Sequence, residues 1–316
     1  MNPLRTSLLG MTLESPLVLA SGILGLTASS MARVASLGAG AVTTKSFGLE
    51  PRAGHNGPSV LPYEHGMLNC VGLSNPGADE MVREILGFRA VSSAALIASV
   101  FGRTVEEFGA VTSRALEAQP DMIEANVSCP NVQTEFGTPF GADYASCAKV
   151  TAAVKKCAQR IPVAIKLTVN CPDIGLMAKV CEEHGADAIT AINTIGPGML
   201  IATDVCRPVL SNLAGGVSGP AIFPVALRAV WEVRKRTALP IIGLGGVTTA
   251  DHALQMLMAG ASAVGIGSAV YHQGVNVFGD INRDLLAFTA AQGLASLAAI
   301  VGSAHDGSQH GNAVRR

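Results

Sequence analysis

Short runs of apolar residues recur along the chain, separated by segments with helical periodicity. Continuous apolar runs of this length are typical of parallel strands that are buried on both faces of a sheet. The pattern predicts strands over residues 17–21, 41–45, 96–100, 122–127, 163–168, 188–193, 241–245 and 263–267.

Two of the intervening segments carry clear apolar stripes. Residues 250, 253, 254 and 257 form one stripe, which ends before Gly260, and residues 225–233 form another. Pro224 near the start of the second stripe and the basic residues 234–236 in its last turn suit proline's preference for the first turn and the direction of the helix dipole. Both segments are therefore predicted as helices.

One small motif occurs three times where a predicted helix meets a predicted strand. Gly38, Gly185 and Gly260 are each followed by alanine, one further residue, a second alanine and a β-branched residue. Glycine at this point can adopt the left-handed conformation that ends a helix. The motif predicts a repeated helix-to-strand joint.

Alternation of strands and helices indicates a parallel sheet, and eight such units in one chain predict an α/β fold that is a single closed (β/α)8 TIM barrel. We expect one barrel domain over residues 1–301 and a frayed, polar, glycine-rich tail over residues 302–316. An open doubly wound sheet is the alternative, but its usual GxGxxG fingerprint is missing after the first strand.

The amino-acid composition argues against several classes of function. The chain has 22 basic and 23 acidic residues and 4% aromatic residues, which argues against nucleic-acid binding because that function needs a basic surface and stacking rings. The seven cysteines form no CxxC pair, so neither a disulfide framework nor a zinc cluster is expected. The histidines are scattered, and no metal site is predicted.

Neither a signal peptide nor a membrane-spanning segment is predicted from the sequence. Residues 1–5 contain no apolar signal-peptide core, and the run over residues 91–101 is too short to cross a bilayer. With its unpaired cysteines, the chain is expected to be cytoplasmic and without membrane contact.

Polar residues follow most of the predicted strands. In a barrel of this kind, chemistry takes place where strands run into their following loops. The strand ends are Ser21, Lys45 with Ser46, Ser99, Asn126, Lys166, Asn193 with Thr194, Gly245 with Gly246, and Gly267 with Ser268.

Glycines follow the last two predicted strands. Gly245 and Gly246 end one, and Gly267 ends the other beside Ser268. Phosphate sites in these barrels typically use the loops after strands seven and eight, where glycines leave backbone N–H groups unshielded. These loops are predicted to bind a phosphate group.

The segment 124–131 is the most informative local motif. Asn126 and Asn131 flank Cys129, and carboxamides can recognise a ring in which C=O and N–H groups alternate. A cysteine near a ligand can act as nucleophile or base. The residues 69–77 form a second distinctive loop, which by itself is also compatible with a plain turn.

Taken together, Asn126-Val127-Ser128-Cys129-Pro130-Asn131, the segment 69–77 and Gly215-Gly216-Val217-Ser218-Gly219-Pro220-Ala221 resemble dihydroorotate dehydrogenase. The similarity extends from about residue 17 to residue 269, with the motifs in family order. It implies oxidation of dihydroorotate to orotate on bound FMN, in pyrimidine biosynthesis.

The resemblance also implies roles for single residues. Cys129 matches the catalytic base of class 1 enzymes, where class 2 enzymes carry serine, and Lys45 matches a residue that holds the substrate carboxylate. The other substrate-binding positions are Asn69, Val71, Gly72, Leu73, Asn126, Asn131, Asn193 and Thr194. The flavin-binding positions are Ser21, Lys45, Ser46, Ser99, Asn126, Lys166, Ile192, Gly219, Gly245, Gly246, Gly267 and Ser268.

Finer features indicate the subclass. Residues 67–69 and 75–77 resemble class 1B more than the fumarate-using class 1A, and no helical extension precedes the barrel as in the quinone-linked enzymes. Class 1B implies an NAD-linked heterotetramer, in which a partner subunit carries FAD and an iron–sulfur cluster. A homodimer of this chain is expected within it.

The sequence departs from the family pattern in three places. Ser99 stands where asparagine is usual near the flavin, and Phe223 replaces a lysine, which is expected to alter a surface or partner contact. The stretch 132–141 lacks the usual paired glycines of a loop that covers the substrate.

Three other readings stay open. Dihydropyrimidine dehydrogenases share the barrel and the cysteine but have histidine where this chain has Asn131. Lys166 could instead form a Schiff base in a flavin-free phosphosugar enzyme. A barrel that binds flavin or pyrimidine without turnover is the non-enzymatic alternative.

Overall fold

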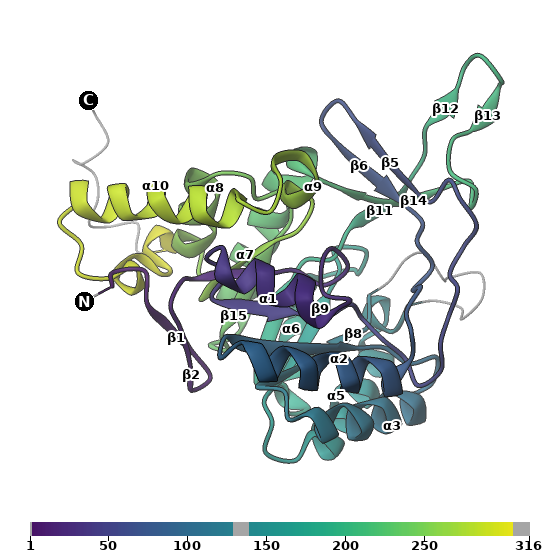
Figure 1. Cartoon of the computed structure of the whole chain (residues 1–316), viewed down its shortest axis with the longest axis horizontal. Helices are drawn as coiled ribbons and strands as arrows, with labels where there is room; N and C mark the ends of the chain where they lie inside the picture. Colours follow the sequence, from purple (N-terminus) through teal and green to yellow (C-terminus); the bar gives the residue numbers. More distant parts are fainter. Residues whose placement is uncertain (1, 129–138, 306–316) are drawn as a thin grey trace.

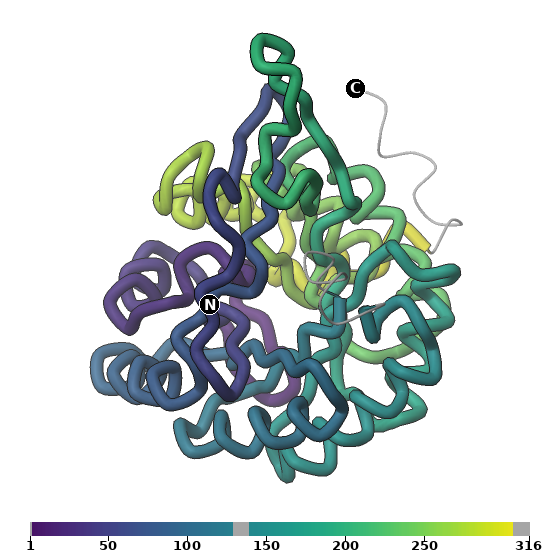
Figure 2. Tube along the Cα trace, turned by 90° about the vertical axis from the view of Figure 1, so that its right-hand side faces the viewer, coloured from purple at the N-terminus to yellow at the C-terminus, as the bar shows by residue number. Residues whose placement is uncertain are grey.

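The computed structural model describes residues 2–128 and 139–305. Eight parallel strands close into a barrel in the order β10-β15-β16-β3-β4-β7-β8-β9, with helices around it (Figures 1 and 2). The strands are β3 (Leu17–Leu19), β4 (Ala41–Thr43), β7 (Ala95–Val100), β8 (Met122–Asn126), β9 (Val163–Leu167), β10 (Ala188–Ala191), β15 (Ile241–Leu244) and β16 (Ala263–Ile266). Each of the eight predicted strands is confirmed, which also confirms the (β/α)8 barrel.

The helices alternate with these strands, and their apolar faces pack on the outside of the barrel in one large core. They are α1 (Ala28–Ser36), α2 (Ala78–Val91), α3 (Val105–Ala115), α5 (Tyr144–Ala158), α6 (Ile174–Glu183), α7 (Phe223–Arg236), α8 (Ala250–Met258), α9 (Ala269–Gln273) and α10 (Val277–Ala291). Short 3-10 turns are η1 (Leu116–Ala118), η3 (Phe140–Ala142), η4 (Pro220–Ile222), η5 (Leu297–Ile300) and η6 (Ser303–His305).

Local sequence signals fix where the helices begin and end. Thr104, Asp143, Asp173 and Thr249 each precede a helix, and each side chain accepts a hydrogen bond from a backbone N–H of its first turn. At the other end, the three joint glycines all take positive φ, with Gly38 at 107°, Gly185 at 98° and Gly260 at 109°. The predicted helix-to-strand joint is therefore confirmed at all three places.

A hairpin closes the amino-terminal end of the barrel. It consists of β1 (Thr6–Leu8) and β2 (Met11–Leu13), and its Leu8 and Leu13 pack against inward-facing residues of the barrel strands such as Met122 and Ile242. The interior at this end is thus filled with apolar side chains. The sequence pattern did not predict this hairpin.

A second, antiparallel sheet stands over the opposite end of the barrel (Figure 1). It runs in the order β11-β14-β6-β5, from β5 (Val60–Tyr63), β6 (Gly66–Asn69), β11 (Ile195–Gly198) and β14 (Gly215–Ser218). The pair β12 (Ile201–Ala202) and β13 (Arg207–Pro208) forms an arm that projects beyond it. Residues 60–69 and 195–218, which are distant in sequence, thus form one wall above the carboxyl end of the barrel.

The carboxyl-terminal segment is packed as far as it is described. The 3-10 turn η6 lies against α8, where His305 Nε2 is 3.0 Å from the Ala259 carbonyl. The His305 ring also stacks on Trp231 of α7, with centroids 3.7 Å apart. Residues 302–305 are therefore folded rather than frayed, and residues 306–316 lie outside the described part. Within the residues described, no helix combines the length and the apolar character needed to cross a bilayer.

Candidate functional site

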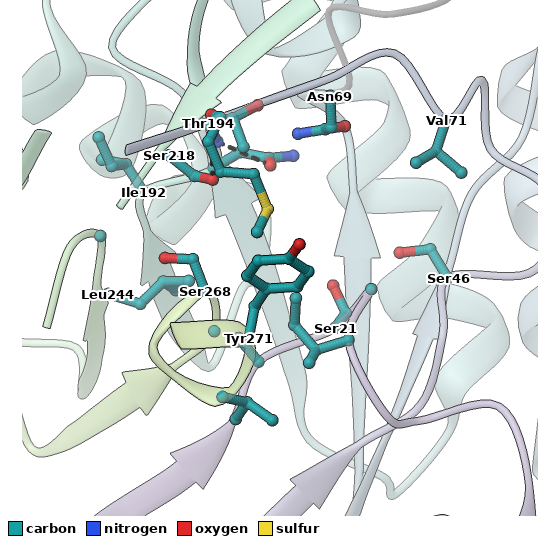
Figure 3. Close-up of a pocket in the computed structure, with 18 of the residues that line it drawn as sticks. Ser21, Ser46, Asn69, Val71, Ile192, Thr194, Ser218, Leu244, Ser268 and Tyr271 are labelled. Carbon is teal, nitrogen blue, oxygen red and sulfur yellow. Dashed lines mark hydrogen bonds between the residues drawn. The ribbon is translucent and has the colours of Figure 1, made fainter. Parts of the chain in front are cut away.

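A cavity of about 480 Å³ opens at the carboxyl ends of the barrel strands, below the second sheet. Its lining combines strand ends, the glycine loops and β6 (Figure 3). The predicted site residues that line it are Ser21, Lys45, Ser46, Asn69, Val71, Gly72, Leu73, Asn126, Lys166, Ile192, Asn193, Thr194, Gly245, Gly246, Gly267 and Ser268. Its volume lies in the range of small-molecule and cofactor sites.

The carboxamides on one side of the cavity are held in fixed orientations. Asn193 Nδ2 donates to Asn126 Oδ1 at 3.2 Å and to Ser128 Oγ at 3.1 Å, while its Oδ1 accepts from the Thr194 N–H at 2.8 Å. Asn126 Nδ2 donates to Ser46 Oγ at 3.1 Å. Because these bonds distinguish the oxygen from the nitrogen of each amide, the donors and acceptors offered to a ligand are preset.

A buried ion pair forms the floor of the cavity. Lys166 Nζ donates to Ser21 Oγ at 2.8 Å and lies 3.7 Å from Glu124 Oε1, and both charged side chains are only 4% exposed. Ser99 Oγ donates to the same carboxylate oxygen at 3.0 Å and lies 2.9 Å from Ser46 Oγ. A charge is rarely buried unless it is paired, so this network accounts for the presence of a lysine inside the barrel.

Strand geometry explains how these side chains meet. Side chains of a strand alternate between the two faces, and Met122 faces the barrel interior, so Glu124 two residues later faces it too. The register pairs Ser99 with Glu124 and Asn126 with Lys166 across adjacent strands. The interior therefore changes from apolar at the amino-terminal end to polar beneath the cavity.

Glycines form the opposite side of the cavity. Gly245 and Gly246 have φ of 131° and 72°, a backbone conformation that side chains disfavour. A Cβ on Gly246 would lie 2.6 Å from the Gly219 carbonyl oxygen and 2.8 Å from the Phe223 nitrogen. No larger residue fits there, so this wall exposes backbone instead of side chains.

The second sheet supplies the upper wall. Asn69 on β6 is in register with Gly216 on β14, and its Nδ2 donates to that residue's carbonyl at 3.4 Å. The following loop is fixed from behind, because Arg52 Nε donates to the Gly72 carbonyl at 2.6 Å. In Figure 3 Asn69 and Thr194 lie across the cavity from Ser21 and Ser268.

The analysis of strand ends missed part of the lining. Met67, Ser218 and Tyr271 also border the cavity, and the Tyr271 ring projects into it between Ser21 and Ser268. The first two belong to β6 and β14, which the apolar pattern did not identify. Glu124 was part of the motif around Cys129, yet only the barrel register gives it a role.

Two predicted residues that the structure describes are not in this lining, and two others are not described. Ser99 lies beneath it in the ion-pair network, and Gly219 lies behind Gly246. Cys129 and Asn131 lie outside the described residues, as does most of the stretch 132–141. The described chain reaches Ser128, which is buried and bonded to Asn193.

The expectation for Phe223 was wrong. Its side chain is 7% exposed and is no surface contact, because its ring stacks on the His252 ring with centroids 4.0 Å apart and an interplanar angle of 21°. The Phe223 and His252 rings lie behind the glycine wall, since a Cβ on Gly246 would be 2.8 Å from the Phe223 nitrogen.

Among the residues that the structure describes, the other titratable groups form no metal site. In the described ranges, three or more histidine, cysteine or acidic residues do not gather at any point where an ion could be held. Cys147 and Cys181 lie 3.5 Å apart between α5 and α6, and the hydrogen bond with Cys181, together with burial, raises the pKa of the Cys147 thiol far above its usual value. The Cys147 thiol is therefore unsuited to act as a nucleophile or base.

Comparisons with known proteins agree with one another. A family model described as dihydroorotate dehydrogenase matches residues 3–288. Proteins named dihydroorotate dehydrogenase B (NAD(+)), catalytic subunit, are similar over almost the whole chain. That of Methanothermobacter thermautotrophicus is 45% identical, over 96% of this chain and 99% of that protein. Those of Methanosarcina mazei and Methanocaldococcus jannaschii are 42% and 40% identical, each over 96% of this chain and over 96% and 98% of the relative.

Proposed function

This chain belongs to the dihydroorotate dehydrogenase family, and we propose that its cavity holds FMN and dihydroorotate together, so that the substrate is oxidised to orotate for pyrimidine biosynthesis. The observation that carries the proposal is one cavity with a preset carboxamide cluster on one side, glycine loops on another and a buried lysine between them. Its relatives are catalytic subunits of the NAD-linked enzyme, which assigns the chain to class 1B.

The residues of the cavity fit FMN. The backbone-lined wall at Gly245 and Gly246, continued by Gly267 and Ser268, suits a phosphate group, which backbone N–H groups can bind closely. Lys166 is held at the floor as a cation and suits the part of a flavin ring where reduction deposits negative charge. Ser21, Ser46 and Ile192 complete the proposed cofactor site.

The carboxamide side fits the substrate. Dihydroorotate presents ring C=O and N–H groups beside a carboxylate, and Asn126 and Asn193 present amide groups whose orientation is already fixed. Asn69 and Thr194 extend this set across the cavity, and Asn131 is proposed as a further member. Preset groups lose little freedom on binding, which favours a single orientation of the ring.

The reaction removes a proton from one ring carbon and a hydride from its neighbour. FMN, when bound, supplies the hydride acceptor. We assign proton removal to Cys129, which follows the buried and hydrogen-bonded Ser128 in the sequence. A free thiol has a pKa of about 8.5, so the thiolate needs only modest activation to act as a base.

Two lysines are proposed to supply the positive charges of the site. Lys45 is proposed to pair with the substrate carboxylate and to stabilise the negative charge that develops as the proton leaves. Lys166 is engaged by Glu124 and Ser21, which suits a fixed cation and is unfavourable for a Schiff base, since that needs a free amine.

The assembly is also part of the proposal. We expect a homodimer of this chain within a heterotetramer, in which a partner subunit with FAD and an iron–sulfur cluster passes electrons to NAD. In support, the relatives are named catalytic subunits, and exposed apolar side chains gather on the arm that carries β12 and β13, namely Met199, Leu200, Ile201 and Val205. Such patches mark protein interfaces. A cytoplasmic location is part of the same proposal.

The proposal is tested with the purified protein under anaerobic conditions. We expect a yellow protein with bound FMN whose absorbance near 450 nm, as is usual for oxidised flavins, bleaches on addition of dihydroorotate. Cys129→Ala should retain the flavin while bleaching slows by about 10²–10⁴-fold, the usual contribution of a general base. Cys206→Ala, at an exposed cysteine of the arm, is the matched control and should bleach at the normal rate.

The outcomes separate the alternatives. A colourless protein that does not take up FMN would reject the proposal, and undiminished bleaching in Cys129→Ala would reassign the base. Faster bleaching by dihydrouracil than by dihydroorotate would favour a dihydropyrimidine dehydrogenase. Co-purification of a flavin and iron–sulfur subunit supports the NAD-linked assembly, whereas turnover of the isolated chain with fumarate would contradict it.

A further inference from the structure

A histidine lies behind the glycine wall that the proposed function assigns to the phosphate of FMN. The loop 245–249 joins β15 to α8, and His252 in the first turn of α8 folds back onto it. Its Nδ1 accepts from the Thr248 N–H at 3.3 Å and lies 3.2 Å from Thr248 Oγ1. The ring also makes a hydrogen bond with the backbone of Gly246. One side chain thus holds the loop on both sides of Val247.

The remaining face of the ring is covered by the Phe223 ring, at 4.0 Å between centroids. The backbone of Phe223 in turn lies against Gly246, where an added Cβ would be 2.8 Å from its nitrogen. From the end of α9, Gln273 Nε2 donates to the Thr248 carbonyl at 3.2 Å. The phosphate loop therefore rests on a compact support in which His252 is the central, titratable part.

We infer that His252 is a positioning residue for FMN, and that its neutral imidazole keeps the loop 245–248 in the shape that binds the phosphate group. The inference rests on the proposed function. It depends on protonation because Nδ1 accepts the Thr248 N–H, and an imidazolium would place a second N–H against that donor. Hydrogen bonds that need the neutral form disfavour the charged form.

The surroundings of the ring support the same state. Burial lowers the pKa of His252 below its usual range, against the opposing effects of Asp251 on the same helix and of the hydrogen bond with the Gly246 backbone. Phe223 from α7 and Gln273 from α9 do not titrate. On α10 the charged residues Asp280, Arg283 and Asp284 pair with one another at the surface, and His305 of η6 lies at the far end of α8, against Ala259. Acidification through the lowered pKa of His252, which lies below the ordinary histidine value of about 6.5, should therefore loosen the loop and weaken FMN binding.

The test measures FMN release from the diluted holoprotein by flavin fluorescence, from pH 7.5 to pH 5.0. His252→Gln is the informative variant, because its amide can accept from Thr248 and donate to Gly246 at every pH. Between the two extremes, the dissociation constant of the wild type should rise about fivefold more than that of His252→Gln, the fold-change equivalent to one net hydrogen bond of about 1 kcal/mol. The ionisation of the FMN phosphate itself affects both proteins equally.

Two further variants sharpen the result. His252→Ala should bind FMN more weakly than wild type at pH 7.5, and its affinity should change with pH only as much as that of His252→Gln, since it lacks the support at every pH. His184→Gln, at an exposed histidine after α6 whose ring makes a hydrogen bond with the Val180 carbonyl, should keep the wild-type affinity and profile.

Each outcome bears on the inference. Parallel profiles for wild type and His252→Gln would overturn it, and so would tighter FMN binding by the wild type at low pH, which would mean that a charged His252 attracts the phosphate. Rescue of affinity by glutamine but not by alanine supports it. Absence of FMN from all four proteins at every pH would overturn the proposed function and this inference together, which separates the two failures.

Discussion

The buried ion pair between Lys166 and Glu124, beneath the cavity, is expected to contribute to the stability of the fold. We predict that Glu124→Gln, which keeps the shape of the side chain and removes its charge, destabilises the fold. The carboxylate is 4% exposed and lies 3.7 Å from Lys166 Nζ, so the substitution leaves a buried ammonium whose nearest remaining partner is Ser21 at 2.8 Å.

The magnitude follows from the distance. Two unit charges 3.7 Å apart interact by about 4.5 kcal/mol at the effective dielectric constant of about 20 that describes protein sites. Removal of one partner from a buried pair typically costs about 3–5 kcal/mol. Ser99 can still bond to the glutamine amide, which retains part of the network, so we expect a loss of about 3 kcal/mol.

The assay is urea unfolding of the FMN-free protein, followed by far-ultraviolet circular dichroism, so that ligand binding does not contribute. Lys166→Met combined with Glu124→Gln should lose much less stability than the sum of the two single variants, because no charge is then left unpaired. Arg283→Gln, at an exposed pair on α10, is the control and should unfold like the wild type. A loss below about 1 kcal/mol for Glu124→Gln, or strict additivity in the double variant, would refute the reasoning.

Three further predictions concern other parts of the molecule. Gly246→Ala should lose FMN affinity and more stability than Gly293→Ala, because both positions have positive φ but only the first has backbone within 2.8 Å of the new Cβ; equal losses measured by urea unfolding would contradict this. Maleimide should label the exposed Cys206 in the native protein and leave Cys147 unmodified by mass spectrometry, since hydrogen bonding and burial raise the pKa of the Cys147 thiol. His305→Ala should change the emission of the chain's single tryptophan without affecting bound FMN, and unchanged emission would argue against the stacking.

Much of the barrel could be read from the chain because its signals are local. Strands buried on both faces must be apolar throughout, so all eight stand out between polar loops. The glycines at 38, 185 and 260 indicate the helix-to-strand joints, because they adopt a positive φ that other residues avoid. The antiparallel strands β6 and β14 gave no such signal, since they are only four residues long and contain glycine, and they pair across about 150 residues.

The family motifs predicted most of the residues that line the cavity, including Asn126, Lys166 and the glycines at 245 and 246. The roles of several other residues became clear only from their contacts in the structure. Ser99 departs from the family pattern and is explained by its bond to Glu124, while Phe223 serves as a buried ring against His252. Neither partner is near in sequence, so neither role could be inferred from the chain.

The sequence by itself determined the order of strands and helices and the residue types at the strand ends, because periodicity, helix caps and glycines act over a few neighbouring positions. Only the tertiary structure decided which of those ends share a charge, which loop a histidine supports and which wall the second sheet supplies. Burial and the closing of the barrel bring residues such as Ser21 and Lys166 within hydrogen-bond distance, and the energy of such contacts depends on distances that no local pattern encodes.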